Sequence, residues 1–201
     1  MTPGKRALDI ALALVLLLLT APLMALIALV VAVVDGLPVL YASERMRAPG
    51  RPFTLWKFRT MRPDPEDFGV SGGDKAARIT RTGRMLRRTR LDELPQLWNI
   101  LAGDMSFIGP RPPLRQYAES FPDLYADVLR SRPGISGLAT LAYHRHEERL
   151  LARARTREET DAIYTRSCVP RKARLDLIYQ RNQSLCFDLA LIARTALRAL
   201  R

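Results

Sequence analysis

The chain has 201 residues, which suits a single domain with at most a small appendage. Its 32 Lys and Arg residues exceed its 20 Asp and Glu residues, so the formal net charge is +12 and an anionic partner is expected: nucleic acid, anionic lipid or a phosphorylated substrate. The only two cysteines, Cys168 and Cys186, have no metal-like spacing and exclude a disulfide framework, and we expect both to be reduced thiols in the cytoplasm.

The first feature in chain order is an uncharged apolar run over residues 10–34. As a helix it would be roughly 38 Å long, against ~30 Å for the hydrocarbon core of a bilayer, so its length permits a membrane crossing. The run is too long for the core of a typical signal peptide, and no clear small-residue cleavage site ends it.

Two features of this run favour a hairpin over a straight crossing. Pro22 lies near its middle, where a proline removes a backbone donor and costs ~3 kcal/mol in a helix interior. Basic residues, which prefer the cytoplasm, stand on both flanks: Lys5 and Arg6 before the run, Arg45, Arg47 and Arg51 after it. We predict a re-entrant helix–break–helix in residues 1–36 with Pro22 at the break; a Pro-kinked transmembrane helix is the alternative that stays open.

Beyond a turn signal at residues 35–38, the pattern changes to short strands. Residues 39–41 and 53–58 are predicted strands, and residues 48–52 are the turn between them, so a β-hairpin is expected. Residues 63–75 are predicted to form a loop. Its Ser-Gly-Gly-Asp-Lys end lacks the spacing of a phosphate-binding loop.

Two adjacent carboxylates, Asp92 and Glu93, follow a dense run of arginines. Arginine binds phosphate oxygens with a planar fork, and a carboxylate can attack phosphorus or hold a divalent metal. The same pair would also suit the first turn of an ordinary solvated helix, so its spacing alone leaves both interpretations open. The arginines in question are Arg81, Arg84, Arg87, Arg88 and Arg90.

The rest of the chain reads as mainly helical. An apolar stripe after Pro95 predicts a helix that Gly103 ends, and Arg111 lies between two prolines that stiffen its backbone. Helices are expected over residues 117–130 and 147–165, the second ended by Pro170, and an amphipathic helix over 189–201 is expected to lie on a membrane surface or pack on the core. His144 and His146 are two residues apart and share no helix face, so a surface helix is favoured over a metal site.

The predicted fold class is therefore α+β. It combines the N-terminal re-entrant membrane helix–break–helix (1–36) with a small β-hairpin and a mainly helical cytoplasmic catalytic domain (37–201) with amphipathic interfacial helices.

Taken together and in order, these motifs resemble one family, the bacterial sugar transferases, or small monotopic polyprenyl-phosphate phosphoglycosyl transferases. The match runs nearly from end to end and is carried by Lys5, Arg6, Asp9, Pro22, Glu44 and Arg45, by residues 57–61, 91–97, 103–112 and 133–137, and by Tyr179, Asn182, Ser184 and Asp188.

The resemblance implies transfer of a phosphosugar from a UDP-sugar to a polyprenyl phosphate, usually with Mg²⁺, at the cytoplasmic face of the bacterial inner membrane. By the family pattern Asp92 is the nucleophile and Glu93 its partner, with both as candidate metal ligands. The matching basic positions are Lys57, Arg59, Arg87 and Arg111. UDP-sugar, polyprenyl phosphate and membrane lipids are the implied partners; a homo-oligomer is allowed, and nucleic acid has no role.

One segment departs from the family pattern. Residues 142–145 stand where many members have Asn-Gly-Arg, and the charged segment up to Lys172 is longer, so the sugar is not determined. The competing interpretation from another class is a membrane-tethered nucleic-acid-binding protein. The charge supports it, but no helix-turn-helix, RNA-recognition or zinc pattern does.

Overall fold

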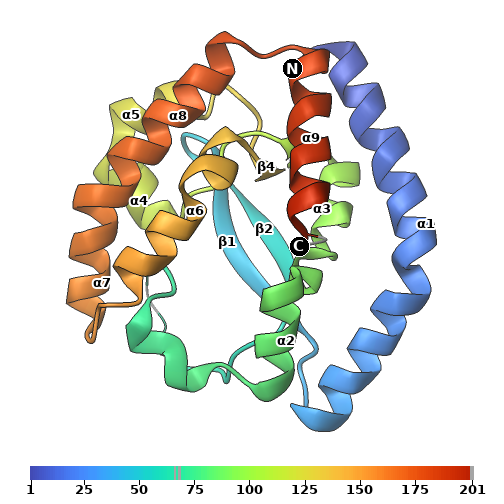
Figure 1. The fold of residues 1–201 in the computed structure, drawn as a ribbon, viewed down its shortest axis with the longest axis vertical. Helices are drawn as coiled ribbons and strands as arrows, with labels where there is room; N and C mark the ends of the chain where they lie inside the picture. Colours follow the sequence, from blue (N-terminus) through green and yellow to red (C-terminus); the bar gives the residue numbers. More distant parts are fainter. Residues whose placement is uncertain (66, 68, 200–201) are drawn as a thin grey trace.

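A computed structural model describes residues 1–65, 67 and 69–199 of the chain. Figure 1 shows one long helix, α1, along one edge, with two short strands near the centre and shorter helices around them. In chain order the elements are α1 (Pro3–Val34), β1 (Leu40–Ala48), β2 (Arg51–Phe58), η1 (Gly73–Arg78), α2 (Arg81–Thr89), η2 (Leu91–Glu93), α3 (Gln96–Ala102), β3 (Ser106–Ile108), α4 (Arg115–Ser120), α5 (Pro122–Val128), β4 (Gly134–Ser136), α6 (Leu138–Leu151), α7 (Arg157–Ile163), η3 (Tyr164–Cys168), α8 (Val169–Arg181) and α9 (Leu185–Ala199).

Helix α1 begins at a cap formed by Thr2, whose side chain accepts a hydrogen bond from the backbone N–H of Lys5. The helix continues through Pro22, and Figure 1 shows it bowed around its middle. The break predicted at Pro22 is therefore wrong, because the chain stays helical through that residue. Thr20, two residues before Pro22, donates its hydroxyl to the carbonyl oxygen of Leu16 at 2.7 Å.

The outer face of α1 is apolar and open. Only 11% of its most apolar 18-residue window is buried, and α1 is the one helix among the described residues that is long and apolar enough to cross a membrane. Leu18, Leu19 and Val33 each expose more than two thirds of their surface. Exposed apolar surface of this extent on one helix indicates contact with lipid or a partner rather than with water.

The N-terminal end of α1 is attached to the rest of the protein by buried charges. Lys5 Nζ lies 2.7 Å from Asp188 Oδ2 of α9, and also donates to the carbonyl oxygen of Ile108. Asp9 Oδ1 accepts hydrogen bonds from the Ser106 hydroxyl and the Phe107 N–H of β3. Because these charged groups are buried and paired, separating this end of α1 from the domain would be costly.

The C-terminal end of α1 is attached as well. The guanidinium of Arg59 donates to the carbonyl oxygens of Asp35, Gly36 and Leu37, which follow the last turn of the helix. Ile27 and Val31 of α1 pack there in a cluster with Phe58 and Leu86. Both ends of the apolar helix thus contact the same polar domain.

The β-hairpin is confirmed. Strands β1 and β2 pair antiparallel, with Leu40 opposite Phe58 and Ala48 opposite Arg51, and Pro49 and Gly50 form the turn. Gly50 has φ +66°, a conformation that favours glycine. The first strand runs to residue 48, well past the three residues predicted for it.

A second, parallel pair of strands was not predicted. Ser106 of β3 lies opposite Gly134 of β4, and Ile108 opposite Ser136. A side chain at Gly109 or Gly134 would collide with the backbone of the neighbouring segment, so the glycines serve close strand approach rather than only a turn.

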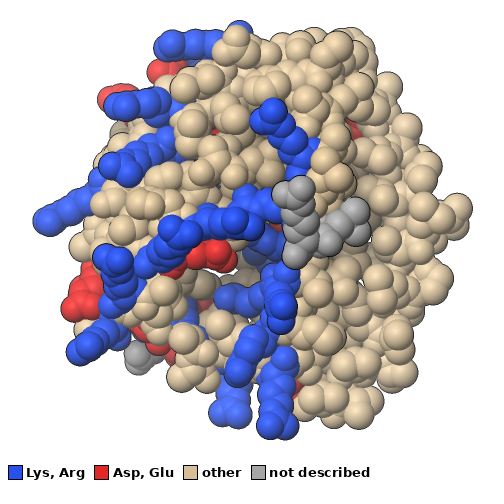
Figure 2. Space-filling model, viewed as in Figure 1, with Lys and Arg blue, Asp and Glu red and all other residues tan. Residues whose placement is uncertain are grey.

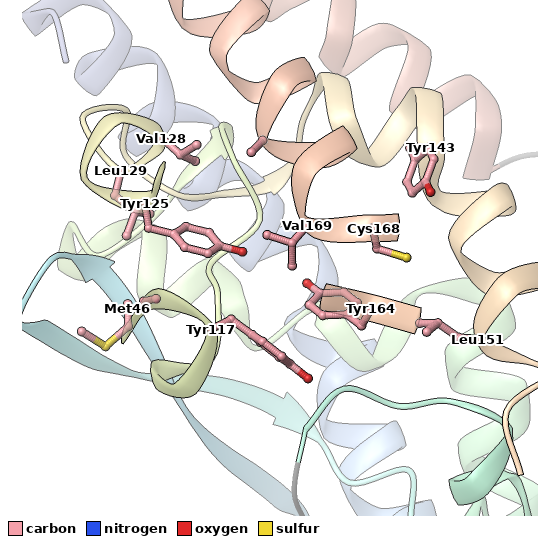
Figure 3. Close-up of a cluster of buried hydrophobic side chains, with 12 residues drawn as sticks. Met46, Tyr117, Tyr125, Val128, Leu129, Tyr143, Leu151, Tyr164, Cys168 and Val169 are labelled. Carbon is pink, nitrogen blue, oxygen red and sulfur yellow. The ribbon is translucent and has the colours of Figure 1, made fainter. Parts of the chain in front are cut away.

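The C-terminal half is helical, as predicted, with different boundaries. The expected helix over 117–130 is divided at Phe121 into α4 and α5, and the expected helix over 147–165 is α6, a connection and α7. Pro170 breaks no helix: it lies in the first turn of α8, directly after the π turn η3, and the chain stays helical from α7 through η3 into α8. Figure 3 shows the core between these helices, in which Tyr117, Tyr125 and Tyr164 lie around Val169, with Tyr143 beyond Cys168.

The last predicted helix is confirmed. It begins at Leu185, earlier than predicted, and packs inward through the buried Leu191, while residues 200 and 201 of the prediction lie outside the described residues.

The buried pair between α1 and α9 generates a stability prediction. Asp188→Ala should lower the free energy of unfolding by ~3–5 kcal/mol, because Lys5 is left buried and charged without its partner. Denaturant unfolding in detergent micelles, followed by tryptophan fluorescence, measures the change.

The matched control is Asp127→Ala, which removes an exposed carboxylate paired with Arg130 and should change stability by at most ~0.5 kcal/mol. Lys5→Met combined with Asp188→Leu should recover much of the loss, since apolar residues often replace a buried ion pair without cost. Equal stability of the Asp188 and Asp127 variants would contradict the assignment of α1's attachment to this pair.

Candidate active site

The two adjacent carboxylates lie in the junction between α2 and α3. Arg90 ends α2 in a left-handed conformation, φ +60°, and its N–H donates to the carbonyls at the end of the helix. The chain then makes one short 3₁₀ turn, η2, which contains Asp92 and Glu93, before α3 begins. A tight turn between two helices thus places the carboxylates. The alternative interpretation, the first turn of an ordinary solvated helix, is wrong.

Apolar and amide side chains hold this junction in place. Leu91 and Leu94 pack toward the cluster of Phe58 and Leu86, so the backbone on both sides of the carboxylates is anchored. Asn99 of α3 is buried. Its side-chain Oδ1 accepts a hydrogen bond from the backbone N–H of Trp56, and its side-chain Nδ2 donates to the backbone carbonyl oxygen of Thr54. These two bonds fix α3 against β2 and bring the junction beside Lys57.

Glu93 is surrounded by three cations. Its Oε1 lies 3.1 Å from Arg111 Nη2, 3.6 Å from Arg90 Nη1 and 3.7 Å from Lys57 Nζ. Burial alone would raise the pKa of the Glu93 carboxyl, but Arg111, Lys57 and Arg90 together lower it to about 2. Glu93 is therefore ionised throughout the physiological range and balances part of the positive charge around it.

Asp92 has a different environment. It is 7% exposed, and its buried Oδ1 has no hydrogen-bond partner within the described part of the chain. Burial, and then the neighbouring charge of Glu93, raise the pKa of the Asp92 carboxyl above its ordinary value. A carboxylate oxygen that is desolvated and unbonded retains its lone pairs, which suits a nucleophile or a ligand.

Lys57 and Arg87 complete the cationic wall. Burial, followed by the charge of Arg111, lowers the pKa of Lys57 to about 8 even though Glu93 acts in the other direction. Arg87 donates through Nε to the Thr60 hydroxyl at 3.0 Å and reaches toward Ser71, and the charge of Asp92 acts on it. Of the four predicted phosphate-binding residues, the structure thus brings Lys57, Arg87 and Arg111 to the carboxylates.

Arg59, the fourth, is not brought there. It is 6% exposed, and all the hydrogen bonds of its guanidinium go to the carbonyls after α1. Its match to a basic position of the family pattern implied a phosphate-binding role. Because β2 ends at Phe58, Arg59 no longer follows the alternation of the strand, and its side chain turns to the end of α1.

Two residues near the site were missed as site residues. Arg45 of β1 donates to the carbonyl oxygen of Pro112, and burial together with Arg111 lowers its pKa to about 10. His144 of α6 contacts Arg90 through Nε2 and lies 3.1 Å from Glu148. The departure of residues 142–145 from the family pattern was the available signal for His144, and the Glu44-Arg45 motif for Arg45.

His144 is a neutral imidazole in this setting. Burial and the charge of Arg90, followed by Arg111, lower its pKa to about 3, so it stays unprotonated and can accept a hydrogen bond from Arg90. His144 and His146 both lie on α6, so the helix predicted for them is confirmed.

The pair of carboxylates can still contribute to a divalent cation. Mg²⁺ needs only one or two protein carboxylates when substrate phosphates and water fill its other positions. The unbonded Oδ1 of Asp92 fits that role, whereas the Glu93 oxygen nearest the cations is already shared among three of them. The donor set therefore fits a metal that binds together with a phosphate substrate, through Asp92.

The basic residues around this site are part of a larger feature. Figure 2 shows Lys and Arg as a band across one face of the molecule that passes the C-terminal end of α9, while the edge along α1 is almost without charge. A cationic face beside an apolar edge suits an anionic substrate handled at a lipid surface. The fold and site thus define an α+β protein with one long, exposed apolar helix and a buried pair of carboxylates among cations.

The sequence comparisons identify the family to which this combination belongs. The family model described as bacterial sugar transferase matches residues 2–201, and the chain belongs to that family.

Several relatives have defined names. The chain is 39% identical over 166 residues to the UDP-glucose:undecaprenyl-phosphate glucose-1-phosphate transferase of Escherichia coli K12, covering 81% of this chain and 36% of the relative. It is 34% identical over 197 residues to the UDP-N-acetylgalactosamine-undecaprenyl-phosphate N-acetylgalactosaminephosphotransferase of Aeromonas hydrophila. That match covers 95% of this chain and 42% of the relative. It is 43% identical over 118 residues to a putative undecaprenyl-phosphate N-acetylgalactosaminyl 1-phosphate transferase of Bacillus subtilis. That match covers 58% of this chain and 66% of the relative. The chain thus spans less than half of the first two relatives and about two thirds of the third.

The lowered pKa of Lys57 generates a prediction for anion binding. Affinity for inorganic pyrophosphate, measured by isothermal titration calorimetry, should fall as the pH rises through about 8, because Lys57 loses its charge there. In Lys57→Arg the fall should disappear from this range, since a guanidinium stays protonated.

Arg130→Lys, at a position 75% exposed and away from the site, is the matched control and should leave the pH dependence unchanged. A Lys57→Arg protein that kept the same midpoint near pH 8 would assign the titration to another group.

Proposed function

We propose that the chain is a phosphoglycosyl transferase, a transferase of substituted phosphate groups. It moves a phosphosugar from a UDP-sugar to a polyprenyl phosphate and gives polyprenyl-diphosphosugar and UMP. The observation that carries this proposal is the buried, unbonded oxygen of Asp92 beside cations held around Glu93. The names of the relatives, which specify UDP-sugars and undecaprenyl phosphate, agree with it.

Binding of the nucleotide sugar depends on the cationic wall. Arg111 and Arg87 present planar donors to the diphosphate oxygens, and Lys57 adds a compact charge. Glu93 is a positioning residue in this scheme: it holds Arg111, Arg90 and Lys57 at 3.1–3.7 Å from one oxygen and keeps them together before substrate arrives. The partly buried setting makes these charges more effective than they would be in water.

Catalysis proceeds through Asp92 in two displacements. The carboxylate oxygen of Asp92 that is not used for the metal attacks the β-phosphorus of the UDP-sugar, the bond from that phosphorus to the bridging oxygen breaks, and UMP leaves with the bonding electrons. A phosphate oxygen of the lipid then attacks the same phosphorus and releases the Asp92 carboxylate. Two displacements replace one difficult transfer, and the cations offset the charge that develops on the leaving phosphate.

A Mg²⁺ ion bound through Asp92 and the substrate diphosphate would supply further charge neutralisation of the phosphate oxygens. With UDP-sugar soluble and the acceptor in the membrane, the reaction belongs at the cytoplasmic face of the bacterial inner membrane, as an early membrane step in glycoconjugate assembly. The charge that suggested a nucleic-acid-binding protein is accounted for by phosphate substrates and lipid headgroups, and the comparisons give that alternative no support.

The membrane topology proposed for residues 1–36 is re-entrant, with the catalytic domain, 37–201, on one side. Its support is the attachment of α1 at both ends: Lys5 and Asp9 bind the domain at one end, and Arg59 binds the carbonyls at the other. A helix that crossed the bilayer would place one of these ends on the far side, away from its partners. The bow of α1 in Figure 1 is compatible with a helix that enters and leaves by one face.

The nucleophile is tested by Asp92→Asn. UMP release from UDP-sugar in the presence of polyprenyl phosphate should fall by roughly a thousandfold or more, because an amide is a far poorer nucleophile and several kcal/mol of catalysis depend on the covalent step. UDP binding by the variant should persist, since the cationic wall is intact.

The control is Asp127→Asn, which changes an exposed carboxylate of α5, and it should have wild-type turnover. Retention of a tenth of the wild-type UMP release by Asp92→Asn would rule out Asp92 as the nucleophile.

The topology is tested with single cysteines at Gly4 and Leu37. Both positions are exposed, a side chain at Gly4 meets only ordinary contact, and the native Cys168 is fully buried, so only Cys186 needs replacement by Ser. In intact bacteria both new cysteines should be protected from a membrane-impermeant thiol reagent, and both should react after lysis.

The Cys186→Ser parent without a new cysteine gives the background. A transmembrane α1 would leave one of the two positions labelled in intact cells and the other protected, and that pattern would contradict the re-entrant topology.

A further inference from the structure

Thr60 holds Arg87, one of the cations of the candidate active site, by one edge of its guanidinium. Thr60 is 7% exposed, and its Oγ1 accepts a hydrogen bond from Arg87 Nε at 3.0 Å. Arg87 Nη2 lies 3.1 Å from Met61 Sδ and 3.5 Å from Ser71 Oγ. Because Nε and Nη2 form one of the donor edges of a guanidinium, the protein itself occupies this inner edge.

The outer edge of the same guanidinium is available. Arg87 Nη1 makes no hydrogen bond or ion pair with residues 1–65, 67 and 69–199. Burial lowers the pKa of Arg87, and the charge of Asp92 is the largest influence in the opposite direction, so the guanidinium lies near that carboxylate. Nη1 and the outer hydrogen of Nη2 are a planar pair of donors, which matches two oxygens of a phosphate group.

The helix that carries Arg87 is seated directly on the backbone of Thr60. The carbonyl oxygen of Thr60 accepts a hydrogen bond from the Thr80 N–H at 3.1 Å. A Cβ at Gly83 of α2 would collide with the same carbonyl, so only glycine permits this close approach. Gly83 and Arg87 are four residues apart and share one face of α2. The face that contacts Thr60 is therefore the face that carries the guanidinium.

The segment around Thr60 also reaches the end of α1. Arg59, the preceding residue, donates to the carbonyl oxygens of residues 35–37. The Thr80 hydroxyl, next to the N–H that binds Thr60, donates to Asp35 Oδ2 at 3.0 Å. Two neighbouring residues thus bind the end of the apolar helix and the guanidinium of Arg87. The position of Arg87 is fixed relative to α1 by these bonds.

We propose that Thr60 is a positioning residue for the nucleotide-sugar substrate: it holds the inner edge of Arg87 so that the outer edge meets the oxygens of the diphosphate. The proposal rests on the proposed function and adds how one phosphate contact is oriented. An arginine side chain has several rotatable bonds, so fixing one edge before the substrate arrives lowers the ordering cost of binding. Without the hydroxyl, the Nε–H of Arg87 would have no acceptor and the fork would lose its direction.

The test measures affinity for inorganic pyrophosphate by calorimetry, and UMP release from a UDP-sugar in the presence of polyprenyl phosphate. Thr60→Val keeps the shape of the side chain but removes the acceptor. It should lower the pyrophosphate affinity and the kcat/KM for the UDP-sugar by about tenfold each. Thr60→Ser keeps the hydroxyl and should recover most of both values. The matched control is Thr195→Val, which removes a hydroxyl of α9 that contacts Ser136, and it should match the wild type.

A double-variant cycle separates orientation of Arg87 from a general structural effect. Arg87→Met removes every donor of this side chain, so adding Thr60→Val should lower the pyrophosphate affinity no further. An equal loss in both backgrounds, no loss in the wild-type background, or failure of Thr60→Ser to recover the affinity would overturn the assignment. Wild-type protein that releases no UMP from any UDP-sugar but shows the expected pyrophosphate pattern would refute the proposed function and support the role of Thr60 in phosphate binding.

Discussion

The Glu93 carboxylate holds together cations that would otherwise repel one another. Arg111, Arg90 and Lys57 come from three separate segments, and each lies within 3.7 Å of its Oε1. Three cations and one anion leave two positive charges beside Asp92, in a setting where burial strengthens their effect. Removing the anion would lower the pKa of Lys57 further and loosen Arg111. The geometry of the phosphate-binding wall thus depends on a carboxylate whose Oε1 is shared among three cations.

The two acidic neighbours consequently have opposite properties. Glu93 has a pKa of about 2 because cations surround it, and the pKa of Asp92 is raised because burial and the charge of Glu93 outweigh the cations nearby. The two carboxyl groups are adjacent in the chain and lie in the same 3₁₀ turn. Their roles differ because the turn places each of them in a different environment. Divergent pKa values of this kind mark acid–base and nucleophilic assignments in phosphate and sugar chemistry.

Local features of the sequence were sufficient for much of the fold. Alternation over residues 53–58 with a Pro-Gly turn predicted the hairpin, and the apolar run predicted α1. The parallel pair of β3 and β4 was out of reach because each strand has three residues, too few for a period, and the pairing joins segments almost thirty residues apart. Pro170 was misread because a proline in a first helical turn and a proline that ends a helix look alike without the π turn before it.

The site residues also fall into those that local sequence could predict and those that it could not. The carboxylate pair and three of its cations could be inferred from residue type and motif order. Arg59 and His144 could not, since their roles depend on side-chain direction: the end of β2 turns Arg59 toward the carbonyls after α1, and the course of α6 brings His144 to Arg90. No periodicity records such contacts between distant elements.

The left-handed backbone at Arg90 has a consequence for the range of residues that this position tolerates. A non-glycine residue there stores roughly 1–3 kcal/mol of strain, which Gly or Asn would relieve. Neither could supply the charge that Glu93 meets or the donor that His144 meets. Lysine would keep the charge but not the two-sided fork. The backbone conformation and the electrostatics at position 90 therefore favour different residues. Fewer substitutions should be tolerated there than at any exposed arginine of α2.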